Sequence, residues 1–575
     1  MSPPWFTIIL NGGDRNAFVS GRGQFFFESV CQWEKVLVIV PHEDDEINVA
    51  GSLMYHYVQS GSEVFCAFTT NGDYSFDAVT RMKEACRSLQ VLGVKKIFFL
   101  GYGDTSNAYA GGHLFYATDK AVTSPTGHQE TYGCHDFPDY AFIKRGQHSR
   151  YCRQNFKQDL TDLILDIRAD LLVVVDCDVH ADHRAASIVF EEALGDILRQ
   201  SGNSYYPTVL KGFAYCTSFG APKDFYADNI RSVPKPSPGD DILIDTSLYE
   251  WEKRLRFPVR SACRGAYLRR NILYRALFQH ASQSAALHAV RIANGDTVFW
   301  QRRTDNLVFQ ATVTASSGNA AKVCDFKLID TADIDAKKFV PAQYLWSPDD
   351  RDAKRCLYFQ WSSQQVITAV SLAGNIEDSG RIEKVRLSFS DGTSYDIGPL
   401  PTRGRVLEYT LPTPKSVSAC TLKILETTGA AWGLSEVGIF SEVHPKGIIF
   451  PFIKLLVGDD FVYDYVLPQE QERCPLNLYR CQTSSPVTYT VVDSDGAVVD
   501  SQGVVSFSKQ ARYAVIRGEL ADNPGIYDQI YLHRVGPAFL AKRRLLQWLE
   551  DKLLTFYLKK YRKYTHIRHK YLKQL

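Results

Sequence analysis

Short apolar runs alternate with helical stretches over the first half of the chain. Four runs, 36–40, 64–68, 97–100 and 171–175, consist of apolar residues alone, which is typical of strands buried on both faces of a sheet. The stretches between and after them are predicted to be helices: 46–59, 78–92, 156–167 and 183–198. This alternation predicts βαβ units and an α/β domain with a mostly parallel sheet over residues 35–303.

The pattern changes near residue 306, where the predicted elements become short and β-rich. Turn sequences such as Ser390-Asp391-Gly392 separate them, which predicts a β-sandwich over 304–443. Its predicted strands are 311–316, 366–372, 382–389, 406–411 and 421–426. A second β-rich domain is predicted over 449–536, with a hairpin turn at 493–496. Residues 1–34 form an N-terminal segment with no assignment.

Composition narrows the class of protein. A chain of 575 residues suggests about three or four domains. The 65 Lys and Arg residues balance 64 Asp and Glu residues, which excludes a nucleic-acid-coating protein and an acidic disordered one. No apolar run approaches the ~20 residues of a membrane span, and the first residues lack the charge pattern of a signal peptide. The 13 cysteines include no C-x-x-C pair, so we expect free thiols and a cytoplasmic protein.

The charge is unevenly distributed, because residues 540–575 hold eleven Lys or Arg residues and only two acidic ones. Leucines and aromatic residues are interleaved with these basic residues, so 537–575 is predicted to be a basic amphipathic helical tail. Two alternatives remain open for this tail. It could lie on an anionic membrane at the inner face, as a peripheral contact, or it could dock on its own protein. RNA binding fits less well, and no nucleic-acid partner is expected.

Two clusters of polar residues follow predicted strands directly. Residues 41–46 read Pro-His-Glu-Asp-Asp-Glu, and residues 176–183 read Asp-Cys-Asp-Val-His-Ala-Asp-His. In an open parallel sheet, ligands bind outside the carboxyl ends of the strands, so both clusters are expected at one site. Imidazole and carboxylate groups are zinc ligands in hydrolytic sites. The alternative is that Asp45 or Asp182 only caps a helix.

These clusters resemble the motifs of the LmbE-like, or PIG-L, N-acetylglucosaminyl deacetylases. The family pattern Ala/Pro-His-Pro-Asp-Asp-Glu is similar to 41–46, and His-x-Asp-His is similar to 180–183. Thr70-Asn71-Gly72, His280-Ala281-Ser282-Gln283 and 295–299 extend the resemblance over 35–303. It implies a Rossmann-like, mostly parallel sheet and a metal-dependent hydrolase that acts on linear amides.

The resemblance also implies a role for each residue of the two motifs. His42, Asp45 and His183 would bind a divalent metal, usually Zn²⁺, with Fe²⁺ as another possibility. Asp44 would be the general base for the attacking water. His180 would stabilise the oxyanion, with Asp182 orienting its imidazole.

One motif residue departs from the family, since Glu43 stands where the family has proline. Its carboxylate could tighten metal binding, raise the pKa of a neighbour or face solvent. Arg81, Tyr132, Arg145 and His148 are candidate substrate-binding residues. For Arg81 the alternative is a helix-surface pair with Glu84. For His148, as for His135, the alternative is an ordinary solvated or core histidine.

The β-rich segment 304–443 resembles a discoidin-like, carbohydrate-binding β-sandwich through residues 315–317, 388–393 and 433–437. Trp346 and Trp432 could stack on sugars or be buried. The whole chain is thus predicted to be a zinc-dependent deacetylase that converts an N-acetylglucosaminyl or related N-acetyl sugar conjugate to acetate and a free amine. Two alternatives stay open, namely an amidase for a larger sugar-linked amide and a non-catalytic, metal-containing glycan-binding protein.

Overall fold

The computed structural model describes most of the chain. The described residues are 33–104, 120–178, 180–202, 204–214, 229, 231–232, 253–264, 271–288, 292, 295–330, 344–376, 379–445, 451–460, 462–481, 483–542, 544–545, 548–549 and 552. Residues 1–32 of the N-terminal segment and all residues beyond 552 lie outside them, as do residues 105–119 of the segment that follows the third predicted strand.

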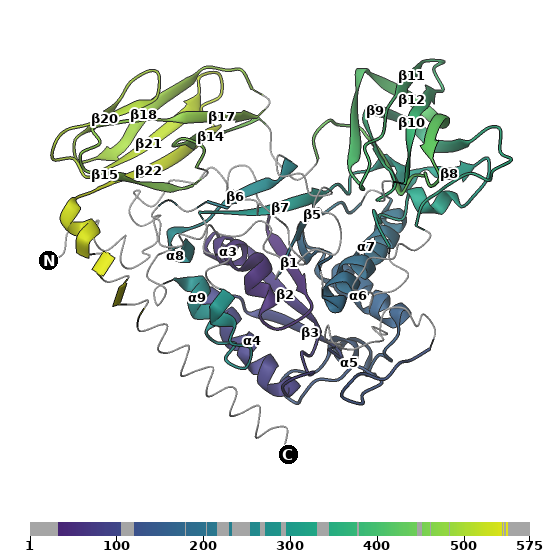
Figure 1. Cartoon of the computed structure of the whole chain (residues 1–575), viewed down its shortest axis with the longest axis horizontal. Helices are drawn as coiled ribbons and strands as arrows, with labels where there is room; N and C mark the ends of the chain where they lie inside the picture. The colour runs from purple at the N-terminus through teal and green to yellow at the C-terminus, as the bar shows by residue number, and fades with distance from the viewer. Residues whose placement is uncertain are drawn as a thin grey trace.

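The N-terminal domain is built on a seven-stranded sheet with the order β3-β2-β1-β4-β5-β7-β6 (Figure 1). The first five strands are parallel neighbours, and β6 and β7 extend the sheet in antiparallel pairing. The parallel α/β fold predicted from the apolar runs is therefore confirmed. The strands are β1 (Lys35–Val40), β2 (Glu63–Thr70), β3 (Lys96–Tyr102), β4 (Leu171–Val175), β5 (Thr208–Gly212), β6 (Leu255–Pro258) and β7 (Asp296–Arg302).

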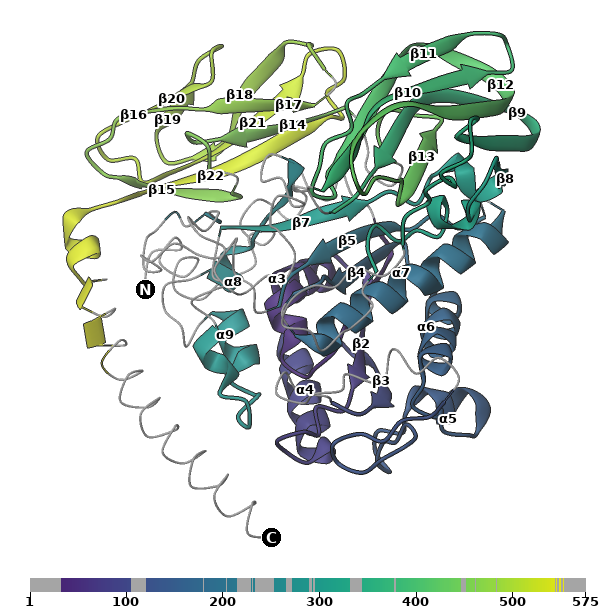
Figure 2. The ribbon, with the colours of Figure 1, turned by 45° about the vertical axis from the view of Figure 1, so that its right-hand side comes forward.

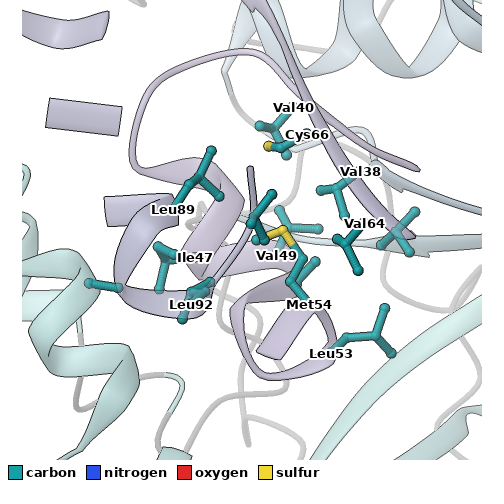
Figure 3. Close-up of a cluster of buried hydrophobic side chains, with 14 of the residues drawn as sticks. Val38, Val40, Ile47, Val49, Leu53, Met54, Val64, Cys66, Leu89 and Leu92 are labelled. Carbon is teal, nitrogen blue, oxygen red and sulfur yellow. The ribbon is translucent and has the colours of Figure 1, made fainter. Parts of the chain in front are cut away.

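Helices cover both faces of this sheet. Strand residues alternate between the faces, so Val36, Val38 and Val40 pack in one core while Leu37 and Ile39 pack in the other. Figure 3 shows part of the first core, where Ile47, Val49 and Leu89 meet the strands. That core is covered by α3 (Asp45–Gln59), α4 (Ala78–Leu92), α8 (Ser261–Arg264) and α9 (Ile272–Leu277), and the other by α5 (Tyr140–Arg145), α6 (Arg153–Ile167) and α7 (Ala181–Ser201). Short 3-10 turns lie at η7 (Ala285–His288), η8 (Leu307–Gln310) and η9 (Ala320–Val323).

The following β-rich segment forms an antiparallel sheet with the order β11-β10-β12-β9-β13, and β8 pairs with β9. Its strands are β8 (Thr312–Ala315), β9 (Cys356–Ala373), β10 (Gly380–Phe389), β11 (Ser394–Ile397), β12 (Val406–Gly429) and β13 (Glu436–Phe440). The two strands predicted at 406–411 and 421–426 are one element, β12. Its pairing with β9 shifts register between Thr410 and Lys415, where Pro412 and Pro414 offer no N–H for the ladder.

The last β-rich block contains three small sheets, with the orders β14-β17, β15-β22-β21-β18 and β16-β20-β19 (Figure 2). The hairpin predicted at 493–496 is wrong: this turn joins β18 to β19, and the two strands belong to different sheets. The strands are β14 (Phe452–Leu456), β15 (Asp464–Pro468), β16 (Arg473–Pro475), β17 (Asn477–Cys481), β18 (Val487–Ser494), β19 (Ala497–Val499), β20 (Val504–Phe507), β21 (Tyr513–Leu520) and β22 (Tyr527–Val535).

Both β-rich parts contact the α/β domain through polar side chains. Arg302 at the end of β7 donates to Glu191 of α7 at 2.9 Å and to Glu436 of β13 at 2.6 Å. On the other side, the Tyr463 hydroxyl lies 3.4 Å from Nδ1 of His56 in α3. Strand β7 therefore contacts the first β-rich part, and helix α3 contacts the last one.

Two further expectations can be compared with the structure. The eleven cysteines of the described ranges are free thiols. Trp346 is fully buried and donates to the Ser317 carbonyl, so it is no stacking platform, whereas Trp432 is half-buried beside Arg355. Among the helices of the described chain, none is both long and apolar enough to cross a membrane.

Candidate active site

The candidate site lies where the strand order reverses. β1 continues to β2 and β3 on one side, and its other neighbour β4 continues to β5. Open α/β sheets bind ligands at such a switch point, outside the carboxyl ends of the strands. His42 follows β1, and His180 and His183 stand at the start of α7 after β4, so the topology brings the two polar clusters together.

The three predicted metal ligands form a compact triangle. Nδ1 of His42 lies 3.0 Å from Oδ2 of Asp45, which lies 3.1 Å from Nε2 of His183, and the two nitrogens are 3.3 Å apart. All three side chains are buried. Ligand atoms at about 2.0–2.1 Å from a tetrahedral ion stand about 3.3 Å from each other, so this donor set fits a zinc-like ion. The second oxygen of Asp45, Oδ1, is buried and accepts no hydrogen bond from the described residues.

The other nitrogen of His42 faces two carboxylates. Nε2 lies 3.1 Å from Oδ2 of Asp182 and 3.6 Å from Oδ1 of Asp104. The Asp182 carboxylate is farther from His180, at 3.8 Å from Nδ1, although the backbone N–H of Asp182 donates to that nitrogen at 3.2 Å. The Asp182 carboxylate was expected to orient His180, but it lies closer to His42. Two groups of possible ligand atoms lie within 4.8 Å of one another: those of His42, Asp104, His180 and Asp182, and those of His42, His180 and His183.

A carboxylate also holds His183 from behind. Oδ2 of Asp178 lies 2.6 Å from Nδ1 of His183, which directs Nε2 toward Asp45. Burial would lower the pKa of His183, but Asp178 and Asp45 together raise it to about 9. Sequence reasoning assigned no role to Asp178 or Asp104. Both follow strands of the sheet, so the rule that found His42 points to them as well.

Asp44 is held in an unusual conformation. It precedes α3 with φ 137° and ψ −23°, and its side chain does not cap the helix. Its backbone N–H donates to Oε2 of Glu46 at 2.8 Å, and Oε1 of Glu46 lies 2.7 Å from Nε2 of His280. Burial, with the neighbouring charge of Asp45 adding to it, raises the pKa of Asp44 to about 7. A carboxylate with such a pKa suits proton transfer near neutral pH.

Glu43 and Arg81 form a second buried pair. Glu43 is fully buried, so it does not face solvent, and burial raises its pKa to about 7. Arg81 lies 3.5 Å from the Glu43 carboxylate, donates to the backbone oxygen of Glu43 at 2.7 Å and to that of Gly72 at 3.2 Å. Arg81 is therefore not a surface partner of Glu84, whose carboxylate accepts from Ser282. It joins the loop after β1 to the loop after β2.

The other candidate substrate residues differ in position. The Tyr132 hydroxyl donates to Asp73 at 2.6 Å, and Asp73 accepts from the backbone of Asp104, so Tyr132 is one residue removed from the carboxylates around His42. Arg145 pairs with Asp159 and Asp162, and His148 contacts Asp139 at 2.7 Å. The partners of Arg145 and His148 thus lie in and around α5 and α6. His135 is exposed.

Comparison with known proteins places this site in a family. Residues 37–194 match the family model described as GlcNAc-PI de-N-acetylase (PIG-L), and residues 306–440 match a domain of unknown function (DUF7402). A diacetylchitobiose deacetylase of Thermococcus kodakarensis is 38% identical over 85 residues, which are 13% of this chain and 32% of that protein. The chain therefore spans about a third of the length of this curated relative.

Two solved structures resemble parts of the chain. An N,N'-diacetylchitobiose deacetylase from Pyrococcus horikoshii, in complex with an inhibitor, has 18% identity and a TM-score of 0.22, over 37% of this chain and 69% of that one. A family 32 CBM from C. perfringens, in complex with galactose, has 13% identity and a TM-score of 0.17, over 23% of this chain and 93% of that one. Since both polar motifs lie inside the match to the first family model, residues 37–194 are a PIG-L, or LmbE-like, domain.

Proposed function

We propose that the chain is a metal-dependent deacetylase of N-acetylglucosamine-type conjugates, with acetate and a free amine as products. The observation that carries the proposal is the buried triangle of His42, Asp45 and His183 beside a carboxylate, Asp44, whose pKa is raised to about 7. The family match over 37–194 and the deacetylase relative support the reaction type and the class of substrate.

His42, Asp45 and His183 would hold the metal, and we propose Zn²⁺ because two imidazoles and one carboxylate are ligands that zinc accepts in hydrolytic sites. When bound, such an ion polarises an amide carbonyl and lowers the pKa of water. Asp178 fixes the ring of His183, and Asp182 and Asp104 lie against the outward nitrogen of His42. These carboxylates orient the ligands and increase their basicity.

Asp44 would take a proton from the attacking water and return it to the leaving amine. His180 would stabilise the oxyanion that develops on the acetamido group. Its Nδ1 accepts from the Asp182 backbone, so in the neutral ring the proton sits on Nε2, which is the donor for the oxyanion. Burial and the nearby His42 lower the pKa of His180 to about 4, which keeps this ring neutral near pH 7.

The test is acetate release from a panel of N-acetylglucosaminyl conjugates by the protein as isolated, stripped with chelator and reloaded with zinc. We expect release that disappears on stripping and returns with zinc. Asp44→Asn should lower kcat by about 10²–10⁴ and leave metal content unchanged. Release of a larger acyl group instead of acetate would favour the amidase alternative. Bound metal without turnover of any conjugate would favour the glycan-binding alternative. A protein that binds no metal would contradict the proposal.

The described residues of the C-terminal segment 537–552 support a second proposal, a peripheral contact with an anionic membrane. Leu545, Trp548 and Leu549 are 57%, 56% and 40% exposed, and their spacing places them on one face of a helix. Such exposure counts against docking of these three residues on the chain itself. Lys542, Arg544 and Lys552 are exposed on the same segment, and such a mixture fits anionic lipid. The free thiols of the described chain support a reducing, cytoplasmic compartment.

Cosedimentation with lipid vesicles tests this contact. We expect binding to vesicles of phosphatidylcholine with phosphatidylserine, weaker binding at high salt, and little binding to phosphatidylcholine alone. Leu545→Glu combined with Trp548→Glu should abolish binding. Val498→Glu changes a side chain that is 67% exposed in another part of the chain, and should leave binding unchanged. Equal binding of all variants would contradict the proposal.

A further inference from the structure

A buried histidine outside both metal motifs is connected to the backbone of Asp44. His280 follows α9, far along the chain from the site, and is fully buried, as is Glu46. Nε2 of His280 lies 2.7 Å from Oε1 of Glu46, which also accepts from the Ser88 hydroxyl at 3.0 Å. The other oxygen of Glu46 accepts from the backbone N–H of Asp44 at 2.8 Å. His280, Glu46 and Asp44 therefore form one continuous chain of hydrogen bonds.

This chain of contacts ends at a strained residue. Asp44 has φ 137°, a value that side-chain-bearing residues rarely adopt. Such a conformation persists only where the surrounding structure enforces it. Asp77 and Asp139 cap their helices with their side chains, whereas the Asp44 side chain makes no such bond to α3. At this point the carboxylate of Glu46 restrains the Asp44 backbone by accepting its N–H.

The position of Glu46 depends in turn on the segment that carries His280. Two residues further on, Ser282 donates to Glu84 of α4 through its hydroxyl at 2.7 Å and its backbone N–H at 3.0 Å. This second buried pair anchors the segment against α4. The first pair, between His280 and Glu46, is the one that extends to the backbone of Asp44, in the loop between β1 and α3.

We propose that His280 is a positioning residue that acts through Glu46 to hold Asp44 in the orientation a general base needs. This inference rests on the proposed role of Asp44. The pair with Glu84 provides a matched control, because Ser282 belongs to the same segment and also bonds a buried glutamate, but is not bonded to Asp44.

The experiment compares His280→Leu, His280→Gln and Ser282→Ala in the full chain. Glutamine can place an amide N–H where the imidazole Nε2 lies, so it should rescue what leucine loses. We expect His280→Leu to lower kcat by about 10–100-fold, with KM and metal content unchanged, and His280→Gln to stay close to the unmodified protein. Ser282→Ala should leave kcat unchanged even if it lowers Tm.

Hydrogen exchange of the peptide that covers 44–48 gives a readout independent of turnover. It should become faster in His280→Leu and stay unchanged in Ser282→Ala. If exchange responds in this way but the unmodified protein releases no acetate, the positioning role stands and the proposed function fails. If exchange and kcat are unchanged in His280→Leu, or if glutamine is no better than leucine, the inference is overturned. Glu46→Gln, which removes the charge and keeps the shape, serves in the same assays if His280→Leu does not fold.

Discussion

Charged side chains are buried at the carboxyl end of the N-terminal sheet and exposed on the antiparallel sheet. His42, Asp45, Asp182 and His183 are at most 3% exposed and lie within a few ångströms of one another. On β10 and β11, by contrast, Arg386 and Asp396 form an exposed bidentate pair. Burying a charge is costly unless it is paired or binds an ion, so a buried cluster of acids and histidines indicates a functional site. Exposed pairs indicate a solvated surface.

The largest effect should come from removing a ligand of the buried cluster. His183→Ala should abolish metal binding and turnover together, because it removes one of the three proposed ligands and leaves Asp178 without its imidazole. Metal content by elemental analysis and acetate release check this result. A variant with full metal content and full activity would show that the triangle is not the metal site.

Loss of the proposed oxyanion donor, His180, should have a smaller effect. His180→Ala should lower kcat by about 10²–10³ without loss of metal, because removal of one such donor typically costs about 2.7–4 kcal/mol. Steady-state kinetics and metal analysis of the same preparation separate this outcome from that of His183→Ala. Loss of metal in His180→Ala would instead make His180 a ligand.

A buried histidine away from the cluster should affect stability through pH. Burial and the guanidinium of Arg260 lower the pKa of His56 well below its ordinary value. Below about pH 6.5 the unfolded chain binds a proton at this residue that the folded chain does not, so stability falls as the pH falls, by up to about 1.4 kcal/mol per pH unit. Tm measured at pH 7.5 and 5.5 should drop more for the unmodified protein than for His56→Gln. Equal drops would contradict this pKa shift.

The exposed pair should have the smallest effect. Arg386→Gln with Asp396→Asn should leave Tm and turnover unchanged, since exposed ion pairs contribute little and are screened by salt. Thermal unfolding at low and high salt checks this expectation. A clear loss of stability would mean that the contrast between buried and exposed charges is less sharp than the structure indicates.

Sequence patterns predicted the elements that are apolar on both faces. β1 and β4 are continuous apolar runs, and a motif at the end of such a strand can be placed on the sheet edge without knowing the rest. β6 and β7 were not predicted, because β7 reads Asp-Thr-Val-Phe-Trp-Gln-Arg and has no such run. The sequence pattern divides β12 in two, because its prolines resemble a turn although the strand continues past them.

The sequence predicts those site residues that belong to the two motifs. His42, Asp44, Asp45, His180, Asp182 and His183 were named from two short segments, and the structure brings those segments together. Asp104 also follows a strand, but its contact with His42, like that of His280 with Glu46, is shown only by the folded chain. Arg81 was expected either at the substrate or on the surface. It is buried beside Glu43, which stands in place of the family's proline.

The bridge made by Arg302 has a practical consequence. Its guanidinium joins Glu191, on the helix that carries His183, to Glu436 in the β-rich segment, and the neighbouring Asn306 bonds the backbone of Val437 and Ile439. A chain shortened after residue 303 would keep both metal motifs but leave Arg302 and Glu191 at a newly bared face. An inactive fragment would therefore say nothing against the chemistry of the site. Whether the two parts unfold in one calorimetric transition is the better guide to where this protein can be divided.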